Sequence, residues 1–217
     1  MNRGEAAHEI RRRALSAGFD LAGVAALGPS ATGAALERWL AAGHQAGMSY
    51  LERYVAERLD PRRLLPGAKS ILCVAMSYAP DPQSPPDPFW SGVARYAHGE
   101  DYHDAFRQRI AHLAAALEGD FPGLRWRVAV DTAPLLEREW AARAGLGAVG
   151  KNGCLIHPEL GSWLLLGSLV TNLDLEPDLP LADLCGDCSR CLSACPTDAF
   201  PAPFVLDSRR CISYWTI

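Results

Sequence analysis

The sequence predicts an α+β fold, with a mixed α/β sandwich domain over residues 1–178 and a small, incomplete ferredoxin-like 4Fe–4S module over residues 179–217. Stretches with apolar residues at helical spacing alternate with short apolar runs that are typical of strands. The clearest strand patterns are residues 70–78 and 162–171. After a short linker, four cysteines lie within eleven positions, 185–195. A chain of 217 residues is long enough for one substantial core and an appended module of this kind.

Helices dominate the first third of the chain. Residues 5–17 place apolar side chains at helical spacing, which predicts an amphipathic helix. Residues 34–54 predict one or two further helices, interrupted near Gly43 and Gly47. We expect one buried stripe along this segment, formed by Leu36, Trp39, Leu40, Met48, Leu51 and Tyr54.

A buried strand and a long helix follow. Residues 70–78 form a continuous apolar run with β-branched residues, flanked by Gly67 and Pro80, and this predicts a buried strand. Residues 81–88 contain four prolines and predict a surface loop. Residues 103–119 predict an amphipathic helix, whose apolar face carries Phe106, Ile110, Leu113 and Leu117.

The second half of the α/β domain predicts two strands, a helix and a glycine-rich loop. Residues 125–130 and 162–171 are strand-like, and residues 133–144 predict a helix with Pro134 in its first turn. Gly145 follows the end of that helix and begins the loop of residues 145–153. The loop does not have the G-x4-G-K-[ST] spacing of a Walker A motif, so a structural turn is favoured over a phosphate site.

Composition restricts the possible environments. Hydrophobic residues make up 49% of the chain and charged residues 21%, and the net charge of −4 argues against a global nucleic-acid-binding field. No apolar run approaches the roughly 20 residues that cross a membrane, and the first residues do not resemble a signal peptide. The dense cysteines therefore predict metal ligation in a reducing, cytoplasmic protein rather than disulfides.

The cysteine run has the spacing C-x2-C-x2-C-x3-C-P, from Cys185 through Cys188 and Cys191 to Cys195. This spacing is typical of ferredoxins, in which three thiolates bind one cubane cluster and the fourth binds a second cluster. Zinc is the alternative, but structural zinc sites favour separated cysteine pairs or mixtures with histidine. The spacing therefore favours iron–sulfur.

The ligands for two clusters are incomplete. Cys211 can join Cys195 at the second cluster, but each cluster still lacks ligands. Cys73 in the predicted strand and Cys154 after the glycine loop are interpreted as structural thiols. Because the last residues also have a helical pattern, we expect a truncated chain that lacks a second cysteine group.

Asp131 stands where a predicted strand meets a helix, and it has two interpretations. A carboxylic acid whose pKa is raised by burial can donate a proton to a reacting oxygen. Alternatively, Asp131 or Thr132 caps the helix that follows. Tyr102 and His103 are weaker candidates beside such a site, because a histidine at the start of a helix is usually solvated. Arg58 is either a ligand for an anion or an exposed arginine in a turn.

Several segments, taken in order, resemble the epoxyqueuosine reductase family. The resemblance covers nearly the whole chain, and the cysteine spacing together with the order of the pieces makes it specific. The pieces are Arg58–Lys69, Gly99–His103, Asp131–Pro134, Ala144–Gly147, Gly150–Asn152, the cysteine run with Pro196 and Thr197, and Leu206–Ser213.

The resemblance implies a cobalamin-binding domain joined to a two-cluster ferredoxin domain. Such an enzyme reduces epoxyqueuosine to queuosine at the wobble position of the tRNA anticodon, and its clusters feed electrons to cobalt. By this resemblance Asp131 is the proton donor and a cobalamin neighbour. The other implied cobalamin neighbours are Arg58, Lys151, Asn152, Ile156 and Leu166, and the implied cluster ligands are Cys185, Cys188, Cys191, Cys195 and Cys211.

The resemblance also implies partners. We expect a monomer that binds tRNA carrying epoxyqueuosine and receives electrons from a flavodoxin- or ferredoxin-like donor, with no membrane association. Two alternatives stay open. One is another cobalamin and iron–sulfur reductase of the dehalogenase kind, and the other is a ferredoxin-type electron carrier.

Overall fold

The computed structural model describes residues 1–80 and 92–216, so the proline-rich loop expected at 81–88 lies outside the described residues. A four-stranded sheet with the order β1-β2-β6-β3 forms the centre of the molecule, and every neighbouring pair is antiparallel. A separate hairpin pairs β4 with β5. The strands are β1 (Leu21–Ala26), β2 (Ser70–Ser77), β3 (Trp126–Ala129), β4 (Ala148–Val149), β5 (Leu155–Ile156) and β6 (Leu164–Thr171).

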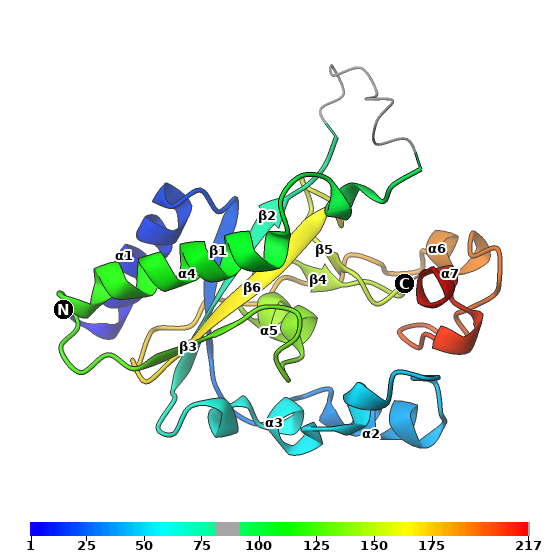
Figure 1. Cartoon of the computed structure of the whole chain (residues 1–217), viewed down its shortest axis with the longest axis horizontal. Coiled ribbons are helices and arrows are strands. Elements are labelled where there is room, and N and C mark those ends of the chain that lie inside the picture. Colours follow the sequence, from blue (N-terminus) through cyan, green and yellow to red (C-terminus); the bar gives the residue numbers. More distant parts are fainter. Residues whose placement is uncertain (81–91, 217) are drawn as a thin grey trace.

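Helices cover both faces of this sheet. Helices α1 and α4 lie on one side, and α5 packs on the other side, nearer to α2 and α3 (Figure 1). The helices are α1 (Arg3–Ser16), α2 (Gly33–Ala41), α3 (Val55–Leu59), α4 (Tyr102–Glu118), α5 (Glu137–Arg143), α6 (Arg190–Ser193) and α7 (Ile212–Trp215). Single 3-10 turns occur at Ser49–Glu52, Pro61–Leu64, Arg95–Ala97 and Ser208–Arg210. The layered arrangement confirms the expected mixed α/β sandwich.

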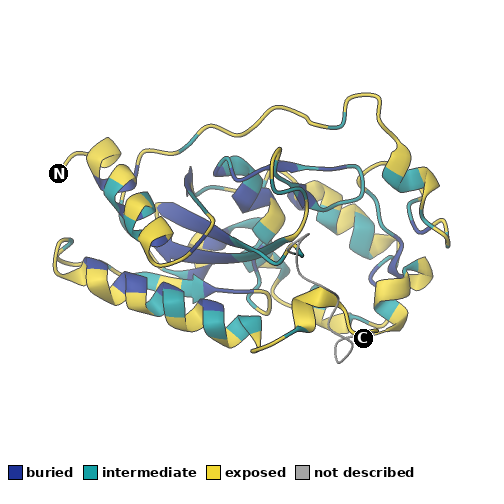
Figure 2. Ribbon diagram, turned by 90° about the horizontal axis from the view of Figure 1, so that it is seen from above, coloured by how far each residue is buried: buried dark blue, intermediate teal, exposed yellow. Residues whose placement is uncertain are grey.

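Alternation along the strands divides the core into two clusters. On β2, Leu72 and Val74 face α1 and α4, whereas Ile71, Cys73 and Ala75 face α5. Successive side chains of a strand point to opposite faces, so one buried strand serves both layers. The buried residues accordingly concentrate on the strands and on the inner sides of the helices (Figure 2).

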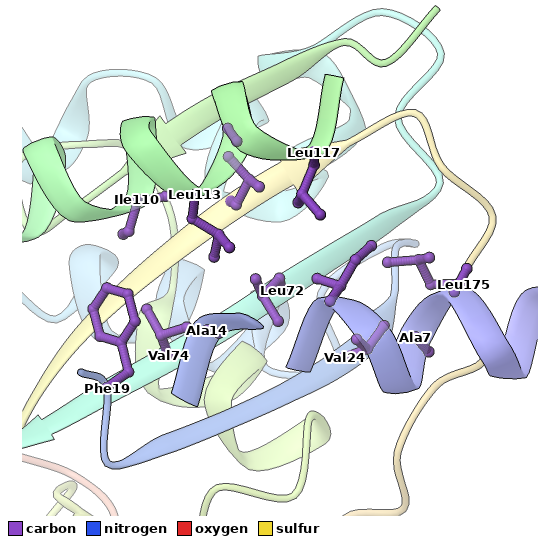
Figure 3. Packing of buried hydrophobic residues seen from close by; sticks show 14 of the residues in the cluster. Ala7, Ala14, Phe19, Val24, Leu72, Val74, Ile110, Leu113, Leu117 and Leu175 are labelled. Carbon is purple, nitrogen blue, oxygen red and sulfur yellow. The ribbon is translucent and has the colours of Figure 1, made fainter. Parts of the chain in front are cut away.

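The cluster beneath α4 shows why this helix forms where the pattern predicted it. Phe106, Ile110, Leu113 and Leu117 are all buried, and they recur at the spacing of one helix face. Figure 3 shows this face meeting the strands and α1. An added Cβ at Gly167 of β6 would lie 2.6 Å from a ring carbon of Phe106, so this glycine allows the helix to approach the sheet closely.

Two details differ from the sequence prediction. The expected buried stripe over residues 34–54 is wrong in part, because Gly33 is the buried residue of α2 and Tyr54 is 64% exposed. The predicted helix over 133–144 begins later, at Glu137. Residues 131–134 bend instead, since Asp131 has a left-handed backbone and Pro134 lacks an N–H group.

Candidate functional site

Asp131 lies in the turn that leaves β3, with its side chain 56% exposed. Its φ angle of +47° is in the left-handed region, which is uncommon for a residue with a side chain. The alternative that Asp131 or Thr132 caps the next helix is wrong, because Leu136 occupies the N-cap position of α5 without a side-chain cap. The strained turn instead presents the carboxylate to solvent. Strain of this kind persists only where surrounding contacts hold it.

His103 joins Asp131 to a second carboxylate. Its Nε2 lies 3.1 Å from Oδ2 of Asp131, and its Nδ1 lies 2.6 Å from Oδ1 of Asp101. Asp101 is the N-cap of α4 and accepts the backbone N–H of His103 at 2.9 Å. Burial opposes the charge on the imidazole, but the bonds to Asp101 and Asp131 together outweigh it and raise the pKa of His103. The imidazole can therefore hold a proton beside Asp131.

Tyr102 forms one wall of this cluster. Its ring stacks on His103 with the centroids 4.0 Å apart. Burial, with the nearby carboxylates of Asp131 and Glu137, raises the pKa of Tyr102 to about 12. Tyr102 therefore stays a neutral hydroxyl at physiological pH and cannot act as a base there.

A cavity of about 540 Å³ adjoins the same turn. Thr132 and Pro134 form part of its wall, and so do the exposed rings of Tyr50 and Tyr54. Its charged lining consists of Arg53, Arg58, Arg63, Arg127 and Glu57. Four guanidinium groups facing one carboxylate make the cavity strongly cationic.

Arg58 gives the clearest indication of what this cavity binds. Its Nε is buried and has no hydrogen-bond partner among the described residues. Burial also lowers the pKa of its guanidinium, since desolvation disfavours the charged form. A buried donor without a partner is costly, so the cavity suits a ligand that brings an anionic or carbonyl oxygen.

The glycine-rich segment forms a hairpin rather than an open loop. Strands β4 and β5 pair across it, and an added Cβ at Gly150 would meet Ile156 at 2.5 Å and Asn152 at 3.0 Å. Asn152 accepts the backbone N–H of Cys154 at 3.1 Å. Lys151 donates through Nζ to the Gly186 carbonyl at 2.7 Å, so this hairpin contacts the cysteine module.

The predicted cobalamin neighbours thus fall into separate places. Arg58 borders the arginine-lined cavity next to the Asp131 turn, whereas Lys151, Asn152 and Ile156 gather in the hairpin. Leu166 lies on β6, on the face that packs against α5. The first turn of α5 connects the two places, because Arg138 donates to the Gly153 carbonyl at 2.6 Å and Glu137 accepts from Asp131.

The predicted cluster ligands lie together in sequence but do not converge on one point. In residues 1–80 and 92–216, no group of three or more His, Cys, Asp or Glu side chains is close enough to share one metal ion. The thiols still have the chemistry of ligands. A hydrogen bond from Arg190 lowers the pKa of Cys188, and the backbone N–H of Ala199 lowers the pKa of Cys195. Thiolates are the form that binds iron.

The two remaining cysteines have different surroundings. Burial raises the pKa of Cys73 to about 12, so this thiol stays protonated inside the core. Cys154 is half-buried next to the hairpin. The environment of Cys73 matches the structural thiol that the sequence predicts.

Sequence reasoning undervalued one residue and missed two others. The sequence favours a solvated histidine at the start of a helix, yet in the structure His103 bridges Asp101 and Asp131. The acidic residues at 101 and 131 were visible, but only the fold places them on either side of the imidazole. Arg63 and Arg127 gave no signal, because only the fold brings their side chains to the same cavity as Arg58.

Comparisons with known proteins agree with this architecture. Residues 184–217 match the family model of a 4Fe–4S double cluster binding domain, and residues 58–132 match that of epoxyqueuosine reductase QueG, DUF1730. The fold and the cysteine module therefore define an iron–sulfur redox protein with an α/β domain.

Sequence relatives identify the family within this class of iron–sulfur proteins. Epoxyqueuosine reductase of Synechococcus sp. (strain RCC307) is 50% identical over 97% of this chain and 66% of that protein. The one from Leadbetterella byssophila is 38% identical over 96% of this chain and 68% of that protein. The chain belongs to the epoxyqueuosine reductase family, and it spans just under two thirds of the length of the Synechococcus relative.

Solved structures show the same likeness. A crystal structure of epoxyqueuosine reductase with an epoxyqueuosine-modified tRNA-Tyr stem loop superposes with a TM-score of 0.89 at 34% identity, covering 98% of this chain and 57% of that one. A B12-dependent reductive dehalogenase shares the fold alone, with a TM-score of 0.53 at 22% identity over 86% of this chain and 22% of that one. Within residues 1–80 and 92–216, none of the helices has the length and apolar character needed to cross a bilayer.

Proposed function

We propose that this chain carries the catalytic part of an epoxyqueuosine reductase, which converts epoxyqueuosine to queuosine in tRNA. The observation that carries the proposal is the Asp131 carboxylate, held on a strained turn between His103 and an arginine-lined cavity. Family membership and the likeness to a structure with a modified tRNA stem loop support it. Net removal of the epoxide oxygen consumes two electrons and two protons and releases water.

Asp131 is proposed as the proton donor of this reaction. Opening the epoxide leaves an alkoxide, which needs an acid within hydrogen-bonding distance. His103, whose pKa is raised, holds a proton 3.1 Å from the Asp131 carboxylate and can return one to it after each turnover. Asp101 holds the imidazole in place through the other ring nitrogen. The second proton comes from solvent, which reaches the exposed side of the turn.

Cobalamin is proposed as the cofactor, and Arg58 is the residue whose surroundings fit it best. Its buried, unpartnered Nε would donate to a phosphate or amide oxygen of the cofactor. When bound, cobalamin supplies the low-potential cobalt that reduces the epoxide-bearing ring. Lys151, Asn152, Ile156 and Leu166 are proposed as further neighbours from the family resemblance.

The cysteine module is proposed to deliver the electrons. Cys185, Cys188 and Cys191 are proposed ligands of one cluster, and Cys195 and Cys211 of a second. Lys151 and Phe204 link the module directly to the hairpin of the α/β domain, with the Phe204 N–H donating to the Lys151 carbonyl at 2.8 Å. We propose that the two parts divide near residue 178. From the family resemblance we propose a flavodoxin- or ferredoxin-like electron donor. We also propose that the protein is a monomer in the cytoplasm.

The decisive experiment tests Asp131 with a modified substrate. The reconstituted protein is mixed anaerobically with tRNA carrying epoxyqueuosine, and queuosine is measured by mass spectrometry after nuclease digestion. Asp131→Asn should lower kcat by about 10²–10⁴-fold, since an amide cannot donate the proton. Asp104→Asn is the matched control on the exposed side of α4, where the Asp104 carboxylate pairs with Arg107, and it should keep its activity.

A second experiment measures cobalamin binding and is independent of turnover of the tRNA. Arg58→Ala should weaken cobalamin binding by about tenfold or more, because it removes a charge-assisted donor. Arg62→Ala is its control, since Arg62 is already paired with Asp60 at 2.6 Å. A protein that turns over a halogenated phenol but not the tRNA would favour the dehalogenase-like alternative. Iron–sulfur absorbance without cobalamin binding would favour an electron carrier.

A further inference from the structure

The Glu137 carboxylate accepts a hydrogen bond from the backbone of the proposed acid, Asp131. Glu137 is the first residue of α5, and its Oε1 accepts the N–H of Asp131 at 3.0 Å. The bond closes the seven-residue loop, 130–136, between β3 and α5. A side chain thus fixes the peptide of the one residue in this loop that has a positive φ angle.

The bond from Asp131 to Glu137 stabilises an unfavourable backbone conformation. A left-handed φ of +47° is strained for an aspartate, and such strain persists only where surrounding contacts hold the backbone. Elsewhere in the loop, Thr132 Oγ1 approaches the Val130 carbonyl at 3.4 Å and the Leu135 N–H reaches the Ala133 carbonyl at 2.8 Å. The Thr132 hydroxyl thus contacts the carbonyl side of the Val130–Asp131 peptide at a long distance, and Glu137 accepts the N–H of the same peptide at 3.0 Å. Among the described residues, Glu137 therefore makes the shorter side-chain bond to this peptide.

Arg138, the next residue after Glu137, contacts the hairpin between β4 and β5. Arg138 donates to the Gly153 carbonyl at 2.6 Å, in the hairpin that carries Lys151 and Asn152. Consecutive residues of one helical turn thus tether two loops that are far apart in sequence. Trp140, on the same helix, is fully buried, so the turn that carries both tethers is anchored in the core.

We propose that Glu137 is a positioning residue that holds the Asp131 turn in the conformation required for proton donation. This inference rests on the proposed role of Asp131 in the reductase reaction. In this role Glu137 acts through the Asp131 peptide. Loss of its carboxylate releases the turn and moves the Asp131 carboxyl away from His103.

The surroundings of Glu137 make the tether sensitive to pH. Burial is the main factor that raises the pKa of Glu137 to about 7, and the Asp131 carboxylate adds to the increase. Arg138 and His103 favour the charged form, while Cys73 on β2 and Tyr102 on α4 face it as neutral groups. A carboxylate accepts a hydrogen bond more strongly than a carboxylic acid does. The hydrogen bond from the Asp131 N–H to Glu137 is therefore stronger above pH 7 than below it.

The test measures the turn itself, so it does not depend on activity. Hydrogen–deuterium exchange on the whole chain reports protection of the Asp131 amide. Glu137→Ala should lower this protection by about tenfold or more, and Glu137→Gln should lower it less, because the amide oxygen still accepts. In the wild type, protection should fall as pH drops through 7, and in Glu137→Gln it should not change with pH.

A matched control comes from the same helix. Glu139 accepts bonds from Ser30 and Ala31 at 2.5 and 2.8 Å, so Glu139→Ala should expose residues 30–32 and leave Asp131 unchanged. Kinetics on the modified tRNA then test the consequence. Glu137→Ala should lower kcat by about tenfold with KM unchanged, and Glu137→Gln should restore much of it.

The outcomes separate this inference from the proposed function. Unchanged protection of Asp131 in Glu137→Ala overturns it, whatever the activity. Faster exchange with an unchanged kcat also overturns it, because the turn would then not matter for turnover. Faster exchange in a chain whose wild type does not reduce the tRNA supports the tether and contradicts the proposed reductase function instead.

Discussion

The α/β domain and the cysteine module are stabilised in different ways. The domain buries two large apolar clusters on either side of its sheet. Among the described residues of the module, Ala199 is the buried apolar residue, and Leu179, Phe204, Ile212 and Trp215 are each more than half exposed. Small units without a core need metals or cross-links to keep one structure. Hydrophobic burial therefore accounts for the domain, and cluster ligation is expected to account for the module.

The contacts between the two parts support this comparison. The module is joined to the domain by polar bonds, such as Trp39 Nε1 to the Leu206 carbonyl at 2.6 Å and the Ser208 N–H to the His44 carbonyl at 3.0 Å. Tyr214 accepts the Gly47 N–H at 3.0 Å. Bonds of this kind set an orientation but contribute little net stability each, about 1 kcal/mol.

Removal of iron should have the largest effect. After anaerobic reconstitution, a chelator with a reductant should bleach the visible absorbance and expose the module to protease, because metal binding and folding are coupled in such units. We expect cleavage within residues 184–217 and an intact α/β domain, measured by limited proteolysis and mass spectrometry. A module that stays protected after its iron is lost would break the comparison.

Truncation of a core side chain should have the next largest effect, and it should affect the domain. Phe106→Ala removes a buried ring that packs on Phe19, and it should lower the free energy of unfolding by about 3–5 kcal/mol. Phe204→Ala, at a 56% exposed position of the module, is the control and should change it little. Urea unfolding followed by circular dichroism measures both. Equal losses would show that burial stabilises the module as well.

A substitution in the polar cluster around His103 should have the smallest effect on stability. Asp101→Asn removes one of two carboxylates that raise the pKa of His103, so the imidazole should titrate at a lower pH, as seen by nuclear magnetic resonance. A raised histidine pKa favours folding at low pH, and this contribution disappears as pH rises through the folded value. The attraction of the pair is complete only between about pH 4 and 6.5, where Asp101 is ionised and His103 protonated. An unchanged titration midpoint would contradict the hydrogen-bonded arrangement.

The sequence alone predicted the elements that depend on local pattern. Helix α4 and strand β2 were predicted to within a residue or two, since their apolar periods are long and regular. The cysteine spacing predicted a 4Fe–4S module, and the family match to residues 184–217 confirms it. Asp131 was singled out at a strand end, and the functional role of this residue stays a prediction.

Only the tertiary structure decided which side chains meet. The late start of α5 follows from the left-handed turn at Asp131, which Glu137 holds from six residues further along the chain. The pairing of His103 with Asp131, and the gathering of Arg58, Arg63 and Arg127 around one cavity, join residues from different elements. Periodicity reports how a residue relates to its own helix or strand. The approach of distant polar groups is determined by how the sheet and its helices pack, and this packing is not encoded in any local pattern.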